Sequence, residues 1–173
     1  MKTKYQISEI LAKETFANFC NQKKFCKLKR FTTKDSADYD VVYTNENGYN
    51  LTIGEIKYRK NKVTDFETWY LEKDKYDRLI QIANSSTNKP KVTYIHHFID
   101  NITAIWDLTE IDVTKLELAY LEMQKNDYSS KKVYKWVFKL PIELSKRFET
   151  DENKPLFYEY NYNELIKKIE NEN

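Results

Sequence analysis

Asp40, Glu55 and Lys57 are the residues of this chain whose types and spacing best suit acid–base and metal chemistry. Side chains alternate between the two faces of a β-strand, so Glu55 and Lys57 project together while Ile56 points into the core. Two carboxylates can hold Mg²⁺ through oxygen and leave positions for water and a phosphate. The ion would lower the pKa of that water. A neighbouring lysine could hold the hydroxide and stabilise charge in the transition state.

A predicted β-hairpin positions these side chains. The first strand is expected at Asp40–Tyr43, and the second, rich in β-branched and aromatic residues, at Tyr49–Tyr58. The segment Asn45-Glu46-Asn47-Gly48 supplies the turn, because Asn and Gly accept the positive φ that a tight hairpin needs. Pairing of the two strands brings the Asp40 carboxylate beside the acid and the lysine of the second strand. The alternative is an ordinary ion pair on a solvated strand face.

Asp40 followed by Glu55-Ile56-Lys57 resembles the D…(D/E)-x-K signature of the PD-(D/E)XK, or restriction-endonuclease-like, nucleases, including small phage- and prophage-type members. The resemblance implies an α/β fold with an αβββαβ core, a mixed central sheet and Mg²⁺-dependent cleavage of DNA, with Mn²⁺ as a substitute ion. Asp40 and Glu55 would bind the metal, the Ile56 carbonyl would add a ligand, and Lys57 would assist the hydroxide. One departure is that no proline precedes Asp40. A second acid-x-Lys triplet, Glu152-Asn153-Lys154, lies in a polar segment with no predicted strand before it.

Other charged residues are candidates on weaker grounds. In the family, the first helix often places an acid near the metal, and the helix after the catalytic strand often carries a Lys or Gln facing the site. The candidate additional acids are Glu9, Glu14, Asp38 and Glu72, and the candidate nucleic-acid contacts are Lys27, Lys29, Arg30, Arg59 and Lys75. The alternatives are solvent-facing helix acids, a charged edge strand that discourages aggregation, and pairing of Glu72 with Lys73 or Lys75.

Composition indicates one globular domain. The 173 residues are enough to bury a core, and we assign 1–173 to a single nuclease-like domain with a core at about 5–108 and a β-rich extension at 109–173. Residues 1–62 hold 13 Lys and Arg against 7 Asp and Glu, although the whole chain has a net charge of only +2. A positive half around a carboxylate pocket suits a phosphate backbone approaching a metal. A solvated basic face explains the same charges.

The lack of a long apolar segment and the small number of cysteines predict where the protein is located and the state of its thiols. No apolar run approaches the roughly 20 residues of a membrane span, so we expect a cytoplasmic protein. Cys20 and Cys26 are too few and wrongly spaced for a zinc site or a disulfide framework, and are expected to be reduced thiols. His96 and His97 are adjacent, so they face opposite sides of a strand; one is expected to be buried and the other exposed.

Periodicity predicts the remaining elements. Phe25–Thr33 alternates, with Phe25, Lys27, Lys29 and Phe31 on one face. Trp69–Glu72 is expected to run into a helix, and Ile142–Phe148 to form a short apolar turn. The predicted helices are Tyr5–Asn21, Lys73–Asn84 and Tyr162–Glu170, and the predicted further strands are Lys91–Phe98, Ile102–Leu108, Val113–Met123 and Lys132–Leu140. A helix is the alternative for Val113–Met123.

The predicted function is a metal-dependent nuclease that hydrolyses phosphodiester bonds in DNA, and the expected partner is DNA or RNA. A homodimer would suit double-strand cutting. The alternative is a catalytically inactive nucleic-acid-binding or phage accessory protein that keeps the fold. It would need the basic segments but not Asp40 and Glu55 together.

Overall fold

The computed structural model describes residues 4–24, 26–32, 38–124 and 131–150. The fold is mixed α/β, with two helices, a six-stranded sheet and a three-stranded sheet among these residues. No helix in the described ranges is long and apolar enough to cross a membrane.

The six-stranded sheet carries the predicted hairpin near its centre. Its strand order is β1-β2-β3-β5-β6-β9, and only β3 and β5 pair in parallel. The crossover between these two strands contains β4 and the helix α2, as parallel pairing requires. The strands are β1 (Cys26–Phe31), β2 (Val41–Asn45), β3 (Thr52–Arg59), β5 (Lys91–Phe98), β6 (Ile102–Asp107) and β9 (Lys146–Glu149).

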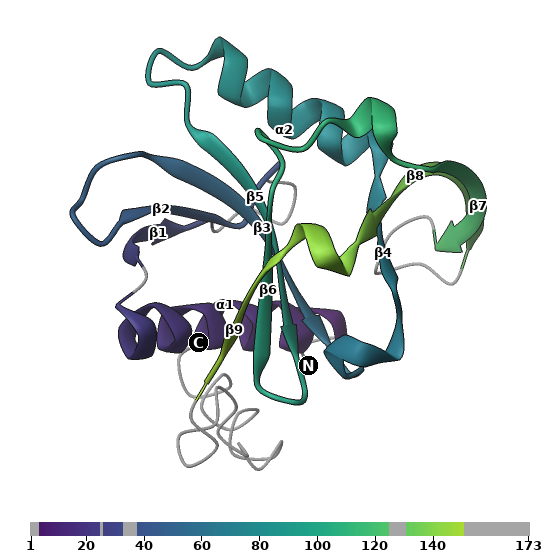
Figure 1. Ribbon diagram of the computed structural model, residues 1–173. Helices are drawn as coiled ribbons and strands as arrows, with labels where there is room; N and C mark the ends of the chain where they lie inside the picture. The colour runs from purple at the N-terminus through teal and green to yellow at the C-terminus, as the bar shows by residue number, and fades with distance from the viewer. Residues whose placement is uncertain (1–3, 25, 33–37, 125–130, 151–173) are drawn as a thin grey trace.

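Helix α1 (Lys4–Lys23) covers one face of this sheet (Figure 1). The helix predicted at Tyr5–Asn21 is confirmed, and one stripe of it is buried. Ile10 and Leu11 are only half-buried, whereas the buried positions recur at i, i+3, i+4, i+7 and i+8. The buried residues are Ala12, Thr15, Phe16, Phe19 and Cys20.

Helix α2 (Lys73–Ser85) and the three-stranded sheet cover the other face (Figure 1). The order of this second sheet is β4-β8-β7, with β4 at Thr68–Glu72, β8 at Lys132–Pro141 and β7 at Leu118–Gln124. Trp69 of β4 lies opposite Leu140 of β8, and both join a core with Trp106.

Trp69–Glu72 does run directly into α2, but these residues form strand β4, which was not predicted. Its pairing partner, β8, lies about seventy residues further along the chain, so local periodicity carries no sign of it. The Ile142–Phe148 prediction is wrong in part: a 3₁₀ turn at Ile142–Leu144 leads into strand β9. Val113–Met123 divides into a 3₁₀ turn at Val113–Lys115 and strand β7. The predicted helix at 162–170 lies outside the described residues.

The hairpin is confirmed, but its second strand begins later than predicted. Gly48 has a φ of 87°, and the Gly48 N–H donates to the Asn45 carbonyl at 2.9 Å. Asn50 also has a positive φ, 55°, so Tyr49 stays in the turn and regular pairing starts at Thr52.

The predicted alternation in the first strand is interrupted by a bulge. The register of β1 against β2 shifts between Leu28 and Arg30. Leu28 and Phe31, three residues apart, therefore both pack against the α1 side of the sheet. A bulge adds one residue to a strand and breaks its two-residue period.

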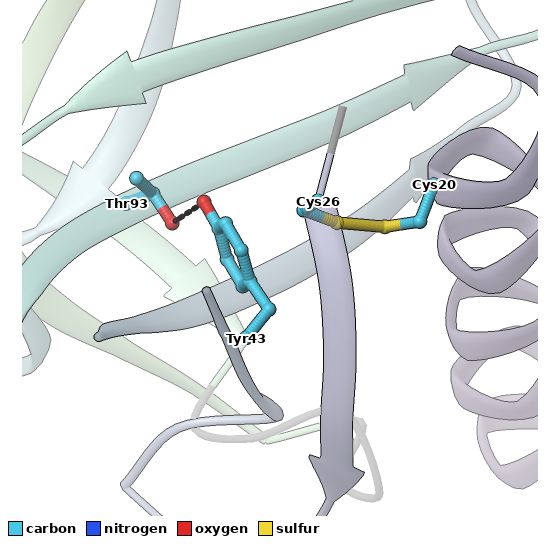
Figure 2. Close-up of a disulfide and its surroundings, with 4 residues drawn as sticks. All are labelled: Cys20, Cys26, Tyr43 and Thr93. Atoms are coloured by element: carbon cyan, nitrogen blue, oxygen red, sulfur yellow. Dashed lines mark hydrogen bonds between the residues drawn. A yellow bond between two sulfur atoms is a disulfide. The ribbon is translucent and has the colours of Figure 1, made fainter. Parts of the chain in front are cut away.

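The prediction of reduced thiols is wrong, because a disulfide joins Cys20 and Cys26 (Figure 2). The tight connection from α1 into β1 brings their Cα atoms to 5.3 Å, within the range that a disulfide spans. Lys24, in this connection, has a φ of 47°.

The prediction that one of His96 and His97 is exposed is also wrong, because both are fully buried. β5 is a central strand with packed layers on both faces, so both of its faces are covered. His96 packs with Tyr94 and Trp106, while His97 lies near Phe16 of α1 and bonds Thr103 at 2.8 Å.

Candidate active site

Asp40 lies directly before β2 and is joined to β3 by two hydrogen bonds. Its backbone N–H donates to the Gly54 carbonyl at 2.8 Å, and its Oδ2 accepts the Ile56 N–H at 2.8 Å. The β2–β3 register pairs Val41 with Gly54, so the next residues in this register are Asp40 and Glu55. The sequence prediction that these two carboxylates lie beside one another is therefore met by the geometry.

Glu55 is the centre of a buried charge cluster. Only 3% of the residue is exposed, and each carboxylate oxygen contacts a different ammonium group. Lys57 Nζ lies 2.8 Å from Oε1, and Lys75 Nζ lies 3.2 Å from Oε2. Lys75 comes from the first turn of α2, so the crossover helix completes the site. Two carboxylates and two ammonium groups thus converge on one face of the sheet.

The two carboxyl groups have opposite pKa shifts. Burial and the negative charge of Glu55 raise the pKa of Asp40 to about 6, against the lowering effect of the Ile56 N–H. Burial also opposes ionisation of Glu55, but the ammonium groups of Lys57 and Lys75 outweigh it and hold its pKa below the ordinary value. Divergent pKa values in neighbouring acids are a common feature of functional sites, although structural ion pairs also produce them.

Lys57 remains an ammonium group. Burial disfavours its charge, but the adjacent Glu55 carboxylate outweighs burial and raises the Lys57 pKa above the ordinary value. Its side chain is still 30% exposed, so the ammonium can reach a ligand from solvent. This group is suited to donate hydrogen bonds and offset negative charge, and it is not suited to accept a proton.

Asp40, Glu55 and the Ile56 carbonyl could supply oxygen ligands to a magnesium ion. The carboxylates of Asp40 and Glu55 are hard oxygen ligands. The Ile56 N–H donates a hydrogen bond to Asp40. The N–H and C=O of one strand residue point toward the same neighbouring strand, so the Ile56 carbonyl also points toward Asp40. The repulsion that raises the Asp40 pKa is what a bound cation would relieve. The described residues contain no group of three or more His, Cys, Asp or Glu arranged for a metal, so the fit depends on two acids and a carbonyl.

Arg59, two positions beyond Lys57, is held by aromatic side chains. Its Nη2 lies 3.2 Å from His96 Nε2 and 3.4 Å from Tyr94 Oη, and its guanidinium lies 5.4 Å from the centre of the Trp69 ring. Burial and the guanidinium lower the pKa of His96 well below its ordinary value, so this histidine stays neutral. The sequence identified Arg59 as a candidate nucleic-acid contact but did not reveal this aromatic support.

The other candidate acids have partners of their own. Glu9 pairs with Lys13 at 2.7 Å, and Asp38 Oδ1 lies 3.2 Å from Arg78 Nε. Glu14 is on α1, which packs against the opposite face of the sheet from Glu55. None of these three appears among the charged neighbours that shift the Asp40 pKa.

Glu72 pairs with Lys135 of β8 at 2.9 Å. The alternative considered for Glu72, a pair with Lys73 or Lys75, is not found, because Lys73 pairs with Asp77 and Lys75 contacts Glu55. The residue before a helix and those in its first turn point in different directions, and the strand β4 directs Glu72 toward its partner strand.

The candidate basic contacts Lys27, Lys29 and Arg30 are exposed on β1, the edge strand of the main sheet. Arg30 Nη2 lies 3.4 Å from the hydroxyl of Tyr39. Just past β1, the Thr32 N–H donates to the Asp40 carbonyl at 2.8 Å. The strand that carries these basic residues is therefore hydrogen-bonded, just past its end, to the backbone of Asp40.

A cavity of about 870 Å³ is lined by Tyr43 and Thr93, whose hydroxyl groups are 3.0 Å apart (Figure 2). Tyr43 belongs to the α1-side core. This cavity is thus separate from the Asp40–Glu55 cluster, and sequence reasoning did not identify it.

Compared with known proteins, the chain matches no protein-family model, no curated protein and no solved structure. Functional conclusions therefore depend on the residues and contacts of this chain.

Proposed function

We propose that this protein is a metal-dependent nuclease that hydrolyses phosphodiester bonds in DNA. The observation that carries the proposal is the convergence of Asp40 and Glu55 with Lys57, which lies 2.8 Å from Glu55. Apart from β4, the described elements from α1 to β5 follow the αβββαβ order of restriction-endonuclease-like nucleases, and the main sheet is mixed, with β3 and β5 parallel. The sequence signature and the element order support the same class.

In this proposal, Asp40, Glu55 and the Ile56 carbonyl would hold Mg²⁺, and the ion would supply an acidified water and screen the charge of the scissile phosphate. Glu55 would then contact the two lysines less closely. The Lys57 ammonium is then available to orient the attacking oxygen and to donate to the phosphate in the transition state. Lys75 keeps Glu55 in place from the opposite side, at 3.2 Å.

The raised pKa of Asp40 adds a pH condition, because proton and metal compete for the same carboxylate. Metal affinity is expected to rise as pH increases through about 6, the pKa of Asp40. The attacking water loses its proton to solvent or to the phosphate, since Lys57 is already protonated.

The deciding experiment compares Lys57→Ala with wild type on linear, nicked, branched and single-stranded DNA, in Mg²⁺ and in EDTA. Losing one well-placed electrostatic contact costs about 10²–10³ in rate. We expect that loss in Lys57→Ala, with DNA affinity near wild type. Lys60→Ala is the matched control, because Lys60 is an exposed lysine just after β3. Cleavage that persists in EDTA, or that is equal in wild type and Lys57→Ala, refutes the proposal.

The second candidate is an inactive nuclease-fold protein that binds nucleic acid or another protein. One observation favours it: both oxygens of Glu55 are already neutralised by lysines, so the cluster is satisfied without a metal. Under this alternative, wild type binds DNA but cleaves no substrate, and Mg²⁺ leaves its melting temperature unchanged.

A further inference from the structure

The β7–β8 strand pair carries a row of exposed aromatic and apolar side chains. Tyr120, Tyr134 and Trp136 are 55%, 61% and 49% exposed, and Leu118 is 42% exposed. The register pairs Tyr120 with Trp136 and places all four residues on one face. The Tyr120 ring lies 4.9 Å from that of Trp136 and 5.3 Å from that of Tyr134. We call these four residues the aromatic face.

The aromatic face continues from the protein core beside the candidate active site. Phe138, two residues after Trp136, is on the same face of β8 but is buried, with its ring 5.4 Å from that of Tyr76. Tyr76 follows Lys75, which contacts Glu55. At about 3.3 Å per strand residue, Tyr134 lies ~13 Å along β8 from Phe138. The β7–β8 pair extends away from the main sheet beside β4 (Figure 1).

A lysine lies at the end of the aromatic face. Lys132 has the same strand parity as Tyr134 and Trp136, whereas Lys135 and Lys139 project from the other face of β8, where they pair with Glu72 and Glu117. Lys132 pairs with Glu122 at 2.9 Å. The Glu122 carboxylate is 47% exposed, and exposed pairs are worth little. A phosphate group can therefore replace this carboxylate at low cost.

We propose that the aromatic face stacks unpaired bases of a single-stranded nucleic acid segment. The inference rests on the proposed nuclease function and specifies its substrate class. Aromatic side chains beside lysines bind single strands with little sequence preference, because every base has a stackable face. Duplex bases are already stacked on one another and do not offer that face.

A second copy of this chain is a poorer occupant. The three rings and Leu118 are about half exposed. With about 150–250 Å² per aromatic side chain, the face offers roughly 300–400 Å². A stable protein interface needs about 800 Å² from each partner.

Trp136 allows a direct test, since the other two tryptophans, Trp69 and Trp106, are buried. Binding of a fluorescein-labelled twelve-residue oligo(dT) and of a hairpin duplex is measured by anisotropy in EDTA. We expect Trp136→Ala and Tyr134→Ala each to weaken oligo(dT) binding about 5- to 150-fold, the range for one stacked base. Duplex affinity should stay within about twofold. Tyr49→Ala, which removes a 74% exposed tyrosine from the β2–β3 turn, is the control and should bind as wild type.

Two further measurements make the inference falsifiable. Oligo(dT) should quench the exposed tryptophan emission of wild type, and Trp136→Phe should retain most of the affinity because it keeps a stacking ring. Unchanged oligo(dT) binding in both alanine variants, or an equal loss on duplex, overturns the inference. A wild-type dimer that becomes monomeric in Trp136→Ala, by sedimentation equilibrium, also overturns it and assigns the face to a second copy.

Failure of the nuclease proposal gives a different result. If wild type cleaves nothing in Mg²⁺ while oligo(dT) binding in EDTA still depends on Trp136, the stacking inference is supported and the nuclease proposal is refuted. If wild type cleaves DNA in a Lys57-dependent manner while both alanine variants bind oligo(dT) normally, only the stacking inference is overturned.

Discussion

Replacing Asp40 with asparagine should stabilise the metal-free protein at neutral pH. Burial and the Glu55 charge raise the Asp40 pKa from an ordinary 3.8 to about 6. The folded state therefore binds this proton more tightly than the unfolded state does. As pH rises from about 4 to above 6, ionised Asp40 lowers the free energy of unfolding, and the loss is complete above about pH 6. Asparagine is neutral, and its side-chain oxygen can still accept the Ile56 N–H.

The size of the effect follows from the shift. A difference of about two units corresponds to about 3 kcal/mol at 1.36 kcal/mol per unit. The Asp40 side chain is only partly buried, so solvent screening reduces this to about 1–3 kcal/mol. We expect Asp40→Asn to gain this amount at pH 7.5 in EDTA and to gain nothing at pH 4, where wild-type Asp40 is already protonated.

Urea denaturation of both proteins at several pH values, in EDTA, measures the difference directly. Adding Mg²⁺ at pH 7.5 should reverse the ranking, because an ion that binds only the folded wild type stabilises it. In a Glu55→Gln background the gain from Asp40→Asn should shrink, since the Glu55 charge is one of its two causes. A destabilised Asp40→Asn at pH 7.5, or a gain that does not vary with pH, would refute the reasoning.

Three other predictions concern regions outside the carboxylate pair. Charge reversal at Lys27 and Lys29 should weaken DNA binding and reduce the slope of log K against log salt by about 2, and unchanged anisotropy titrations would show that the basic edge strand is not involved. Reduction of the Cys20–Cys26 disulfide should lower the free energy of unfolding by about 2 kcal/mol for so short a loop. Urea denaturation with and without dithiothreitol measures this difference. The control is Cys20→Ser, whose stability should not respond to the reductant. Burial lowers the His97 pKa from 6.5 to about 3, so the folded state excludes a proton that the unfolded state binds below pH 6.5, and stability should fall as pH drops from 6.5 toward 3. His97→Gln should make that pH dependence less steep, and an identical pH profile would be evidence against this role.

The parts of the site that depend on neighbouring residues could be predicted from the sequence. The turn residues Asn45 and Gly48 and the alternating strands around them define a hairpin, and its register places Asp40 beside Glu55. Helix α2 and strand β5 were also predicted with nearly the observed bounds, because α2 has a clear helical apolar period and β5 is rich in β-branched and aromatic residues. These features are set by interactions close in the chain.

Features that depend on distant residues could not be predicted. Nothing near Trp69 shows that β4 pairs with β8, and nothing near His97 shows that α1 covers it. Lys75 was identified as a candidate, but its contact with Glu55 requires the crossover that places α2 over the main sheet. The bulge in β1 and the disulfide are likewise set by three-dimensional geometry, which an alternating pattern or a cysteine count does not report.

The pairing of β4 with β8 makes the candidate site inseparable from the second half of the chain. A fragment ending at residue 108 would contain all four charged residues of the cluster. It would lack β8, the only described strand that pairs with β4, and the β8 residue Leu140 that packs in the core with Trp69. β4 leads directly into α2, so the position of the Lys75 ammonium depends on a strand more than fifty residues further along the chain. Evolutionary exchange or engineered replacement of the β7–β8 segment would therefore alter the charge balance at Glu55 without changing any residue that touches it.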